Sequence, residues 1–144
     1  MRDGLFRGGW TDIWFRVAQF SGYTGRRLEF NTAMAALGDY ERALVKHLIE
    51  VLQSLPGVTI ARITDPARYH ERVPTVVFTK AGYTPQAIAE HLAKHNIYVW
   101  DGNYYAVEIM NRLGHGTHGM VRVGLAHYNA HDEIDRLATA LRQL

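Results

Sequence analysis

Apolar residues recur at steps of three and four over residues 31–55, which is the period of one face of an α-helix. Pro56 and Gly57 follow this stretch, and such a pair typically ends a helix. The pattern therefore predicts one long helix that begins near Asn31 and ends before Pro56. The residues that share its apolar face are Ala33, Leu37, Tyr40, Leu44, Leu48, Val51 and Leu55.

Short β-rich runs alternate with shorter helical segments in the rest of the chain. Val58–Ile63 and Val73–Thr79 predict two strands, because both are rich in β-branched residues. A polar loop that opens at Asp65-Pro66 separates them. Two more strands are predicted over residues 97–100 and 119–125, and three helices over residues 84–96, over 104–113 and from 129 to the C-terminus.

Capping residues support the helix boundaries. Thr84 precedes Pro85, which is the usual order of an N-cap and a first helical residue. Asn129 is expected to cap the last helix, with Asp132 three residues on in the capping-box position. The apolar stripe of this helix consists of Ile134, Leu137, Leu141 and Leu144.

This order of elements predicts an α+β fold: a small, mainly antiparallel sheet of about four strands, covered by helices and preceded by a long helix. We expect one domain over residues 31–144. Residues 1–30 form a leader of unclear structure, because glycines alternate there with aromatic residues such as Trp10, Trp14 and Phe20 without a regular period.

Composition excludes several classes of function. The chain has 144 residues, 47% hydrophobic, with a net charge of only +2 and scattered basic residues, so nucleic acid is not an expected partner. Cysteine is absent, which excludes disulfides and thiolate chemistry in this chain. No apolar run approaches the roughly 20 residues of a membrane span, so no membrane partner is expected and the predicted location is cytoplasmic.

The histidines and glycines do not predict a catalytic, metal or nucleotide site. His91 and His95 have the i,i+4 spacing of two metal ligands, but no third ligand is evident and two solvated side chains are the favoured interpretation. His115 and His118 lie in the loop "GHGTHG", which lacks the spacing of a phosphate-binding loop.

Arg122 is the most unusual residue of the predicted strands. It interrupts the apolar run "MVRVGL", and a guanidinium remains charged at every cellular pH, so it requires an anion nearby. That anion is either a ligand or a local acid such as Asp101 or Glu108. The sequence leaves both alternatives open.

The motifs "RVPTVVFTKAGYTPQAIAEHLAKHNIYVWDGNYYAVEIMNRLG" and "GMVRVGLAHYNAHDEIDRLATALRQL" resemble the C-terminal small domain of the aminotransferase class V family of pyridoxal-phosphate enzymes, the cysteine desulfurase-like group. The most specific part is an Arg in a strand, followed by Tyr-Asn and an acidic helix. The resemblance covers residues 31–144.

The resemblance implies a role for Arg122. In this family the matching Arg binds the α-carboxylate of an amino-acid substrate above the cofactor, and Asn103, Tyr104 and Tyr105 are further candidate substrate-binding residues. Tyr105 stands where desulfurases have the loop Cys that accepts sulfur. A phenol cannot carry a persulfide, so sulfur transfer is not expected of this chain.

The resemblance also implies a missing part. The family holds pyridoxal phosphate in a large domain with a Schiff-base lysine, whereas the three lysines here, Lys46, Lys80 and Lys94, do not stand in that context. We therefore expect a fragment of a transferase that binds no cofactor and is inactive without a large domain. The predicted partners of the chain are this large domain and a second copy of the chain itself. The alternatives are a stand-alone regulatory module that binds a small carboxylate, and a truncated remnant without function.

Overall fold

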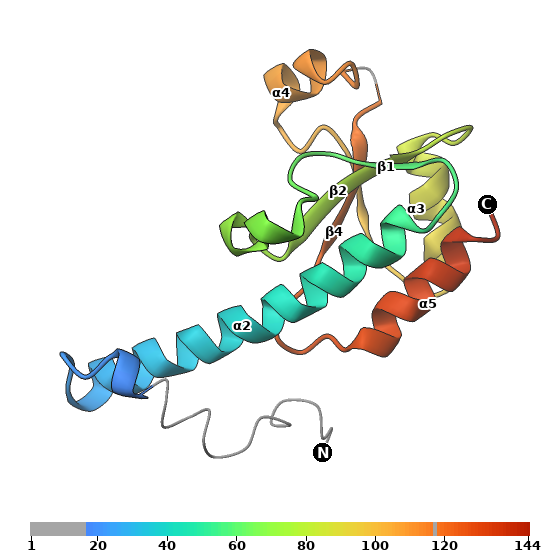
Figure 1. Ribbon diagram of the computed structural model, residues 1–144. Helices are drawn as coiled ribbons and strands as arrows, with labels where there is room; N and C mark the ends of the chain where they lie inside the picture. The colour runs from blue at the N-terminus through green and yellow to red at the C-terminus, as the bar shows by residue number, and fades with distance from the viewer. Residues whose placement is uncertain (1–16, 117) are drawn as a thin grey trace.

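The computed structural model describes residues 17–116 and 118–144. Trp10 and Trp14 of the expected leader lie outside these residues. Figure 1 shows a long helix that runs beside a small sheet and shorter helices. The elements, in chain order, are α2 (Gly25–Gln53), β1 (Val58–Ile60), the 3₁₀ helix η1 (Pro66–Glu71), β2 (Thr75–Lys80), α3 (Pro85–Lys94), β3 (Trp100–Gly102), α4 (Val107–Arg112), β4 (Met120–Gly124) and α5 (His131–Leu141).

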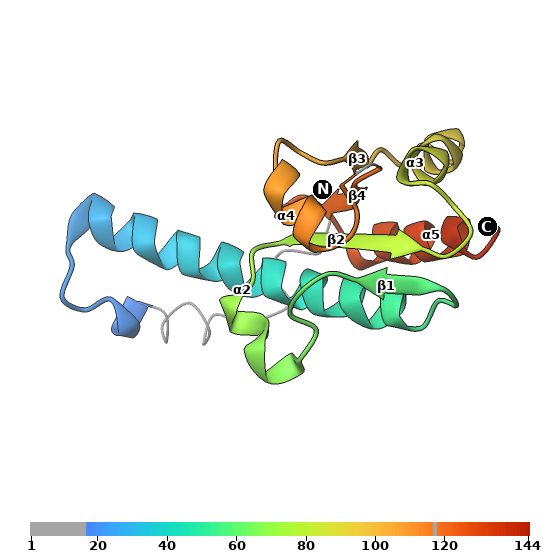
Figure 2. The ribbon, with the colours of Figure 1, turned by 90° about the horizontal axis from the view of Figure 1, so that it is seen from above.

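The four strands form one antiparallel sheet in the order β1-β2-β4-β3, so β4 lies in the interior of the sheet although it comes last in the chain. Helices α2 and α5 run beside each other along the sheet (Figure 2), and α4 stands apart from both of them (Figure 1). The fold is α+β, as the sequence predicts. None of the helices in the described part of the chain is long and apolar enough to cross a membrane.

The core lies between one face of the sheet and helices α2, α3 and α5. Alternate residues of the two central strands point into it, because side chains of a strand alternate between the two faces of a sheet. Val76 and Phe78 of β2 and Val121 of β4 are fully buried there. The buried helical residues that complete this core include Leu44, Leu48, Ile49, Leu52, Ile88, Leu92, Ile134 and Leu141.

Helix α2 is longer than expected. The apolar stripe predicts a start at Asn31, but the helix begins at Gly25 and therefore includes the last residues of the expected leader. Its buried residues start only at Leu44, so the first half of the helix extends beyond the core (Figure 1). None of residues 25–30 belongs to the core that the structure describes, so no apolar period marks them in the sequence. The predicted boundary between a leader of residues 1–30 and a domain of residues 31–144 remains a prediction.

Two central boundaries are corrected by the structure. The third strand is Trp100–Gly102 rather than residues 97–100, because the apolar Ile97 and Val99 pack against the core without joining the ladder. The following helix begins at Val107, not at Tyr104. Tyr104 and Tyr105 have φ angles of 54° and 61°, in the left-handed region, and a right-handed helix cannot include them.

The cap of the last helix is shifted by one residue from the prediction. Ala130 is the N-cap, and the Glu133 carboxylate accepts a hydrogen bond of 2.9 Å from its backbone N–H. The Asn129 side chain instead accepts from the Ala126 N–H at 2.8 Å and donates to Glu133. Asn129 therefore shapes the turn before the helix, and Glu133 takes the place predicted for Asp132. At α3 the predicted cap is confirmed, since the Thr84 hydroxyl accepts from the Ala87 N–H.

Gly119→Ala is expected to destabilise the chain by about 2–4 kcal/mol, within the range of a severe steric change. A Cβ at this position would lie 2.0 Å from the carbonyl group of Gly102, and the φ angle of +71° disfavours any L side chain. Gly124→Ala is the control, because nothing lies within 4 Å of the added carbon, and its effect should stay within about 0.5 kcal/mol. Denaturant unfolding measures both, and equal midpoints would contradict this account of the β3–β4 contact.

Candidate functional site

Arg122 lies on the face of the sheet opposite the core. In the ladder it stands directly between Val77 of β2 and Trp100 of β3, and cross-strand neighbours in a row share one face. Its side chain is half-buried, whereas Val121 and Val123 on either side of it point into the core. The guanidinium therefore lies at the surface of the sheet. The apolar run around it had suggested a position inside the core.

Two aromatic rings surround the charge of Arg122. Its Cζ lies 4.9 Å from the centroid of the Tyr104 ring and 5.4 Å from that of Trp100. Both distances suit cation–π attraction. Within the residues that the structure describes, no carboxylate forms an ion pair with Arg122, and neither Asp101 nor Glu108 does so. The guanidinium is held in place without being neutralised.

Tyr104 is fixed by its backbone and by its hydroxyl. The hydroxyl donates to the Met120 carbonyl and also lies 3.1 Å from the Trp100 carbonyl oxygen. Burial raises the pKa of Tyr104 well above its usual range, against the opposing effect of the Arg122 charge. The phenol is therefore neutral and can serve as a donor at any cellular pH. Together these constraints hold its ring beside the guanidinium.

Asn103 and Tyr105 lie beside this arrangement rather than in it. They line a neighbouring hollow of about 390 Å³, which also borders Trp100 and Tyr104. The Asn103 side chain accepts a hydrogen bond of 3.1 Å from the Tyr105 N–H and so shapes the turn. The Tyr105 side chain is 99% exposed. Of the four residues predicted from the sequence, the structure brings Arg122 and Tyr104 into contact and places the other two at the edge.

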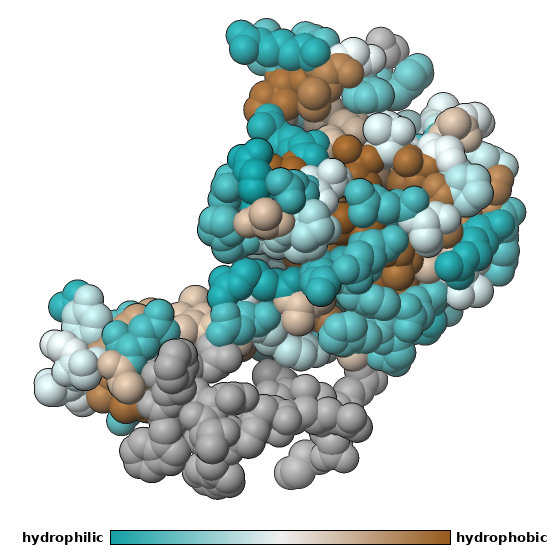
Figure 3. Space-filling view, in the orientation of Figure 1, coloured by the Kyte–Doolittle hydropathy of each residue, from teal (hydrophilic) through white to brown (hydrophobic). Residues whose placement is uncertain are grey.

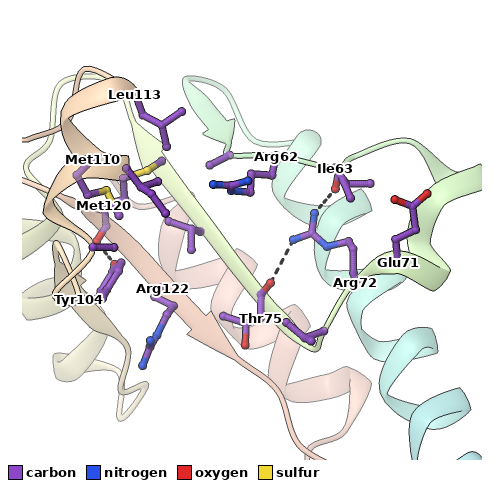
Figure 4. Close-up of a pocket in the computed structure, with 15 residues that line it drawn as sticks. Arg62, Ile63, Glu71, Arg72, Thr75, Tyr104, Met110, Leu113, Met120 and Arg122 are labelled. Carbon is purple, nitrogen blue, oxygen red and sulfur yellow. Dashed lines mark hydrogen bonds between the residues drawn. The ribbon is translucent and has the colours of Figure 1, made fainter.

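A cleft of about 470 Å³ extends from Arg122 across the open face of the sheet. Figure 4 shows Arg122 and Tyr104 at one end and Arg72 at the other. Arg72 donates to the carbonyls of Ile63 and Thr75, and its buried Nε has no hydrogen-bond partner among the described atoms. Sequence reasoning missed this cleft, although the closely spaced apolar residues Ile109, Met110 and Leu113 were a signal for it.

The lysines of the chain do not fit a pyridoxal-phosphate site. Lys80 is buried and its Nζ donates to the Pro56 carbonyl at 3.0 Å, so it stabilises the end of the helix–strand connection. Lys46 lies on exposed helix surface near Glu50, and Lys94 is exposed in the last turn of α3. None of the three lies in the cleft beside Arg122. Among the described residues, the cleft therefore offers no lysine amine for a Schiff base.

The histidines have structural contacts. His91 Nε2 lies 2.9 Å from the Ala140 carbonyl oxygen and so links α3 to α5, and the His95 ring lies beside it at a tilt of 54°. His47, which the sequence did not single out, pairs with Asp135 across α2 and α5 at 2.8 Å. In residues 17–116 and 118–144, no group of three potential ligands is arranged to hold a metal ion.

Comparison of the sequence with known proteins assigns the chain to a family. The model of the family described as aminotransferase class-V matches residues 23–137. The chain belongs to the aminotransferase class-V family. The match begins at residue 23 and so includes the last part of the expected leader. The resemblance stated from the sequence is thereby confirmed.

Individual members of the class-V family support this assignment. The chain is 34% identical over 112 residues to an aminotransferase-like protein, FGM3, of Gibberella zeae, and 28% identical over 122 residues to a cysteine desulfurase of Salmonella agona. These alignments cover 76% and 83% of the chain, but only 27% and 28% of the relatives.

Solved structures of cysteine desulfurases show the same fold. The apo cysteine desulfurase of Thermococcus onnurineus NA1 matches with a TM-score of 0.69 and 24% identity, over 81% of this chain and 28% of that one. The cysteine desulfurase CsdA of Escherichia coli matches with a TM-score of 0.64 and 21% identity, over 84% and 31%. The chain thus spans less than a third of the length of these relatives.

Arg122→Ala is expected to lower the free energy of unfolding by less than about 1 kcal/mol, because the residue loses only two partly exposed cation–π contacts. If Arg122 were instead paired with a buried acid, the loss would be roughly 3–5 kcal/mol. Arg72→Ala is the comparison variant, and it should cost about 2 kcal/mol because it leaves two backbone carbonyls without their donor. Denaturant midpoints of the three proteins measure these differences.

Proposed function

We propose that this chain is the C-terminal small domain of a pyridoxal-phosphate-dependent class-V enzyme that acts on an amino acid. In this proposal Arg122 binds the α-carboxylate of the substrate, and a large domain holds the cofactor. The observation that carries the proposal is the guanidinium of Arg122, which lies on the open face of the sheet, oriented by Tyr104 and Trp100 and free of any described carboxylate.

The geometry supports an orienting role for Arg122. A guanidinium can bind a carboxylate through two parallel hydrogen bonds, which fixes the direction of the ligand as well as its position. The two rings restrict the side chain before any ligand arrives, so less conformational entropy is lost on binding. Pyridoxal phosphate, when bound, stabilises negative charge that develops at the substrate α-carbon. This chain would contribute the orientation of that carbon.

Asn103 and Tyr105 are proposed to lie at the edge of the bound substrate. Tyr105 stands where the desulfurase members have their loop Cys, and the chain contains no cysteine. We therefore expect a reaction other than sulfur transfer. Activity is expected only together with the large domain, and the location proposed for the complete enzyme is cytoplasmic.

The test is a reconstituted enzyme in which this chain is combined with a class-V large domain. Arg122→Ala should raise the dissociation constant of the amino-acid substrate by about 10- to 100-fold, as expected for loss of a charged hydrogen-bonded pair. The absorbance and content of bound pyridoxal phosphate should not change, because the cofactor is held elsewhere. Arg122→Lys keeps the charge but loses the bidentate geometry and should show an intermediate effect.

An unchanged amino-acid affinity in Arg122→Ala would contradict the proposed role of this residue. Loss of the cofactor together with the substrate would contradict the assignment of the cofactor to the other domain. Tight amino-acid binding by this chain without a large domain would favour the stand-alone regulatory module.

The chain is further expected to self-associate when no other domain covers it. The first half of α2 extends beyond the core and exposes Phe30 and Met34, one turn apart on the same face. Introducing both Phe30→Glu and Met34→Glu should shift light scattering toward the monomer mass. Ala43→Glu, an acidic substitution at an exposed position on the opposite side of this helix, should not. A monodisperse monomer of the unmodified chain at every concentration would refute the expectation.

A further inference from the structure

The cleft beside Arg122 is large enough to hold more than a carboxylate. Its volume of about 470 Å³ lies within the usual range of small-molecule sites. It is bounded by β2, by α4 and by the segment that follows β1. In the space-filling view, apolar side chains gather over α4 beside this open face (Figure 3). Because Arg122 lies at one end of the cleft, its charged end and its apolar part are distinct.

The charges around the cleft favour an anion. Arg62, Arg72 and Arg122 all border it, and Glu71 is the acidic residue on its rim. Both carboxylate oxygens of Glu71 accept hydrogen bonds from Arg68, at 2.9 and 2.7 Å. Arg72 is engaged with backbone carbonyls. Within the described residues, Arg122 and Arg62 form no ion pair, so the cleft has an excess of positive charge.

The walls of the cleft favour an apolar group. Ile109 of α4 and Leu113, the residue that caps the end of this helix, lie one turn apart, and both border the cleft while 43% exposed. Met110 and Val77 line it deeper in, from α4 and from the outer face of β2. An occupant with a large apolar surface would remove these side chains from water, which is favourable in proportion to the area covered. A ligand with only a short side chain would leave them solvated.

We propose that this site is selective for carboxylates that bear a large apolar or aromatic group, with the carboxylate on Arg122 and the apolar group between α4 and β2. The substrate class would therefore be α-amino acids with bulky apolar side chains. This inference rests on the proposed carboxylate-binding role of Arg122 and adds the nature of the side chain. It assigns Ile109 and Leu113 as specificity-determining residues.

The experiment measures ligand binding to the full 144-residue chain by two-dimensional NMR, with labelled Ile, Leu, Met and Val methyl groups and the Arg122 side-chain N–H as reporters. The ligands are acetate, butyrate, hexanoate and phenylacetate, with neutral phenylacetamide as the uncharged control. Phenylacetate should bind at least about tenfold more tightly than acetate, in line with burial of one aromatic ring. Its methyl shifts should appear at Ile109, Met110 and Leu113.

Matched variants locate the effect. Leu113→Ala should remove most of the preference for phenylacetate and leave acetate binding unchanged. Val107→Ala is the control, because Val107 lies on the same helix and is 48% exposed but does not line the cleft. Arg122→Gln should weaken the binding of all four carboxylates and leave the affinity for phenylacetamide unchanged. The methyl spectrum of each variant shows whether it is folded, and Ile109→Ala replaces Leu113→Ala if the latter is not.

The outcomes separate the two proposals. Equal affinity for acetate and phenylacetate, both lost in Arg122→Gln, would overturn the apolar selectivity and leave the role of Arg122 standing. Phenylacetate binding that does not depend on Arg122, or no carboxylate binding at all, would overturn the inference together with the carboxylate-binding role.

Discussion

The register of β4 between β2 and β3 determines which face of the sheet becomes the core and which becomes the site. Because strand side chains alternate, Val121 and Val123 enter the core while Arg122 between them faces the opposite side. A slip of one residue would place a guanidinium among Phe78 and the buried helical side chains, at a prohibitive cost. The apolar residues of β4 thus position the charged one, and folding and site formation depend on the same alternation.

The surroundings of Arg122 solve an electrostatic problem in an unusual way. An internal carboxylate would stabilise the charge but would also compete with any ligand for it. Tyr104 and Trp100 attract the cation through their ring faces and leave its hydrogen-bonding edges available. The cost is local, since Tyr104 adopts a left-handed backbone conformation that non-glycine residues seldom occupy. Its neutral hydroxyl, bonded to the backbone of β4, holds this conformation.

The fold was largely predictable from sequence, because burial imposes periods that can be recognised. The Thr84 cap and the order of helices and strands were read correctly, as were Ile134, Leu137 and Leu141 of the α5 stripe, although Leu144 lies beyond the end of that helix. The wrong element boundaries occur where the side-chain pattern does not reflect the backbone conformation. Ile97 and Val99 are apolar and packed but not paired in the sheet, and Tyr104 and Tyr105 give no sequence sign of their positive φ angles.

The candidate site was predictable only in part. Arg122 was recognised as out of place in an apolar strand, and Tyr104 was named beside it. The contact with Trp100 depends on the pairing of β3 with β4, which the sequence does not give, and β3 begins at Trp100 rather than at the predicted Ile97. The cleft brings together α4, β2 and the segment around Arg72, which are far apart in the chain. No local pattern can predict such a meeting of distant segments.

The two halves of helix α2 lie in different surroundings, although one continuous helix joins them. Its buried residues run from Leu44 to Leu52, where it packs against the sheet and α5, whereas from Gly25 to Asp39 none of its residues belongs to the core that the structure describes. Isolated helical segments of this length are only marginally stable in water. Local opening of a helix is easiest where the fewest buried contacts hold it, so along α2 the described core protects the second half more than the first.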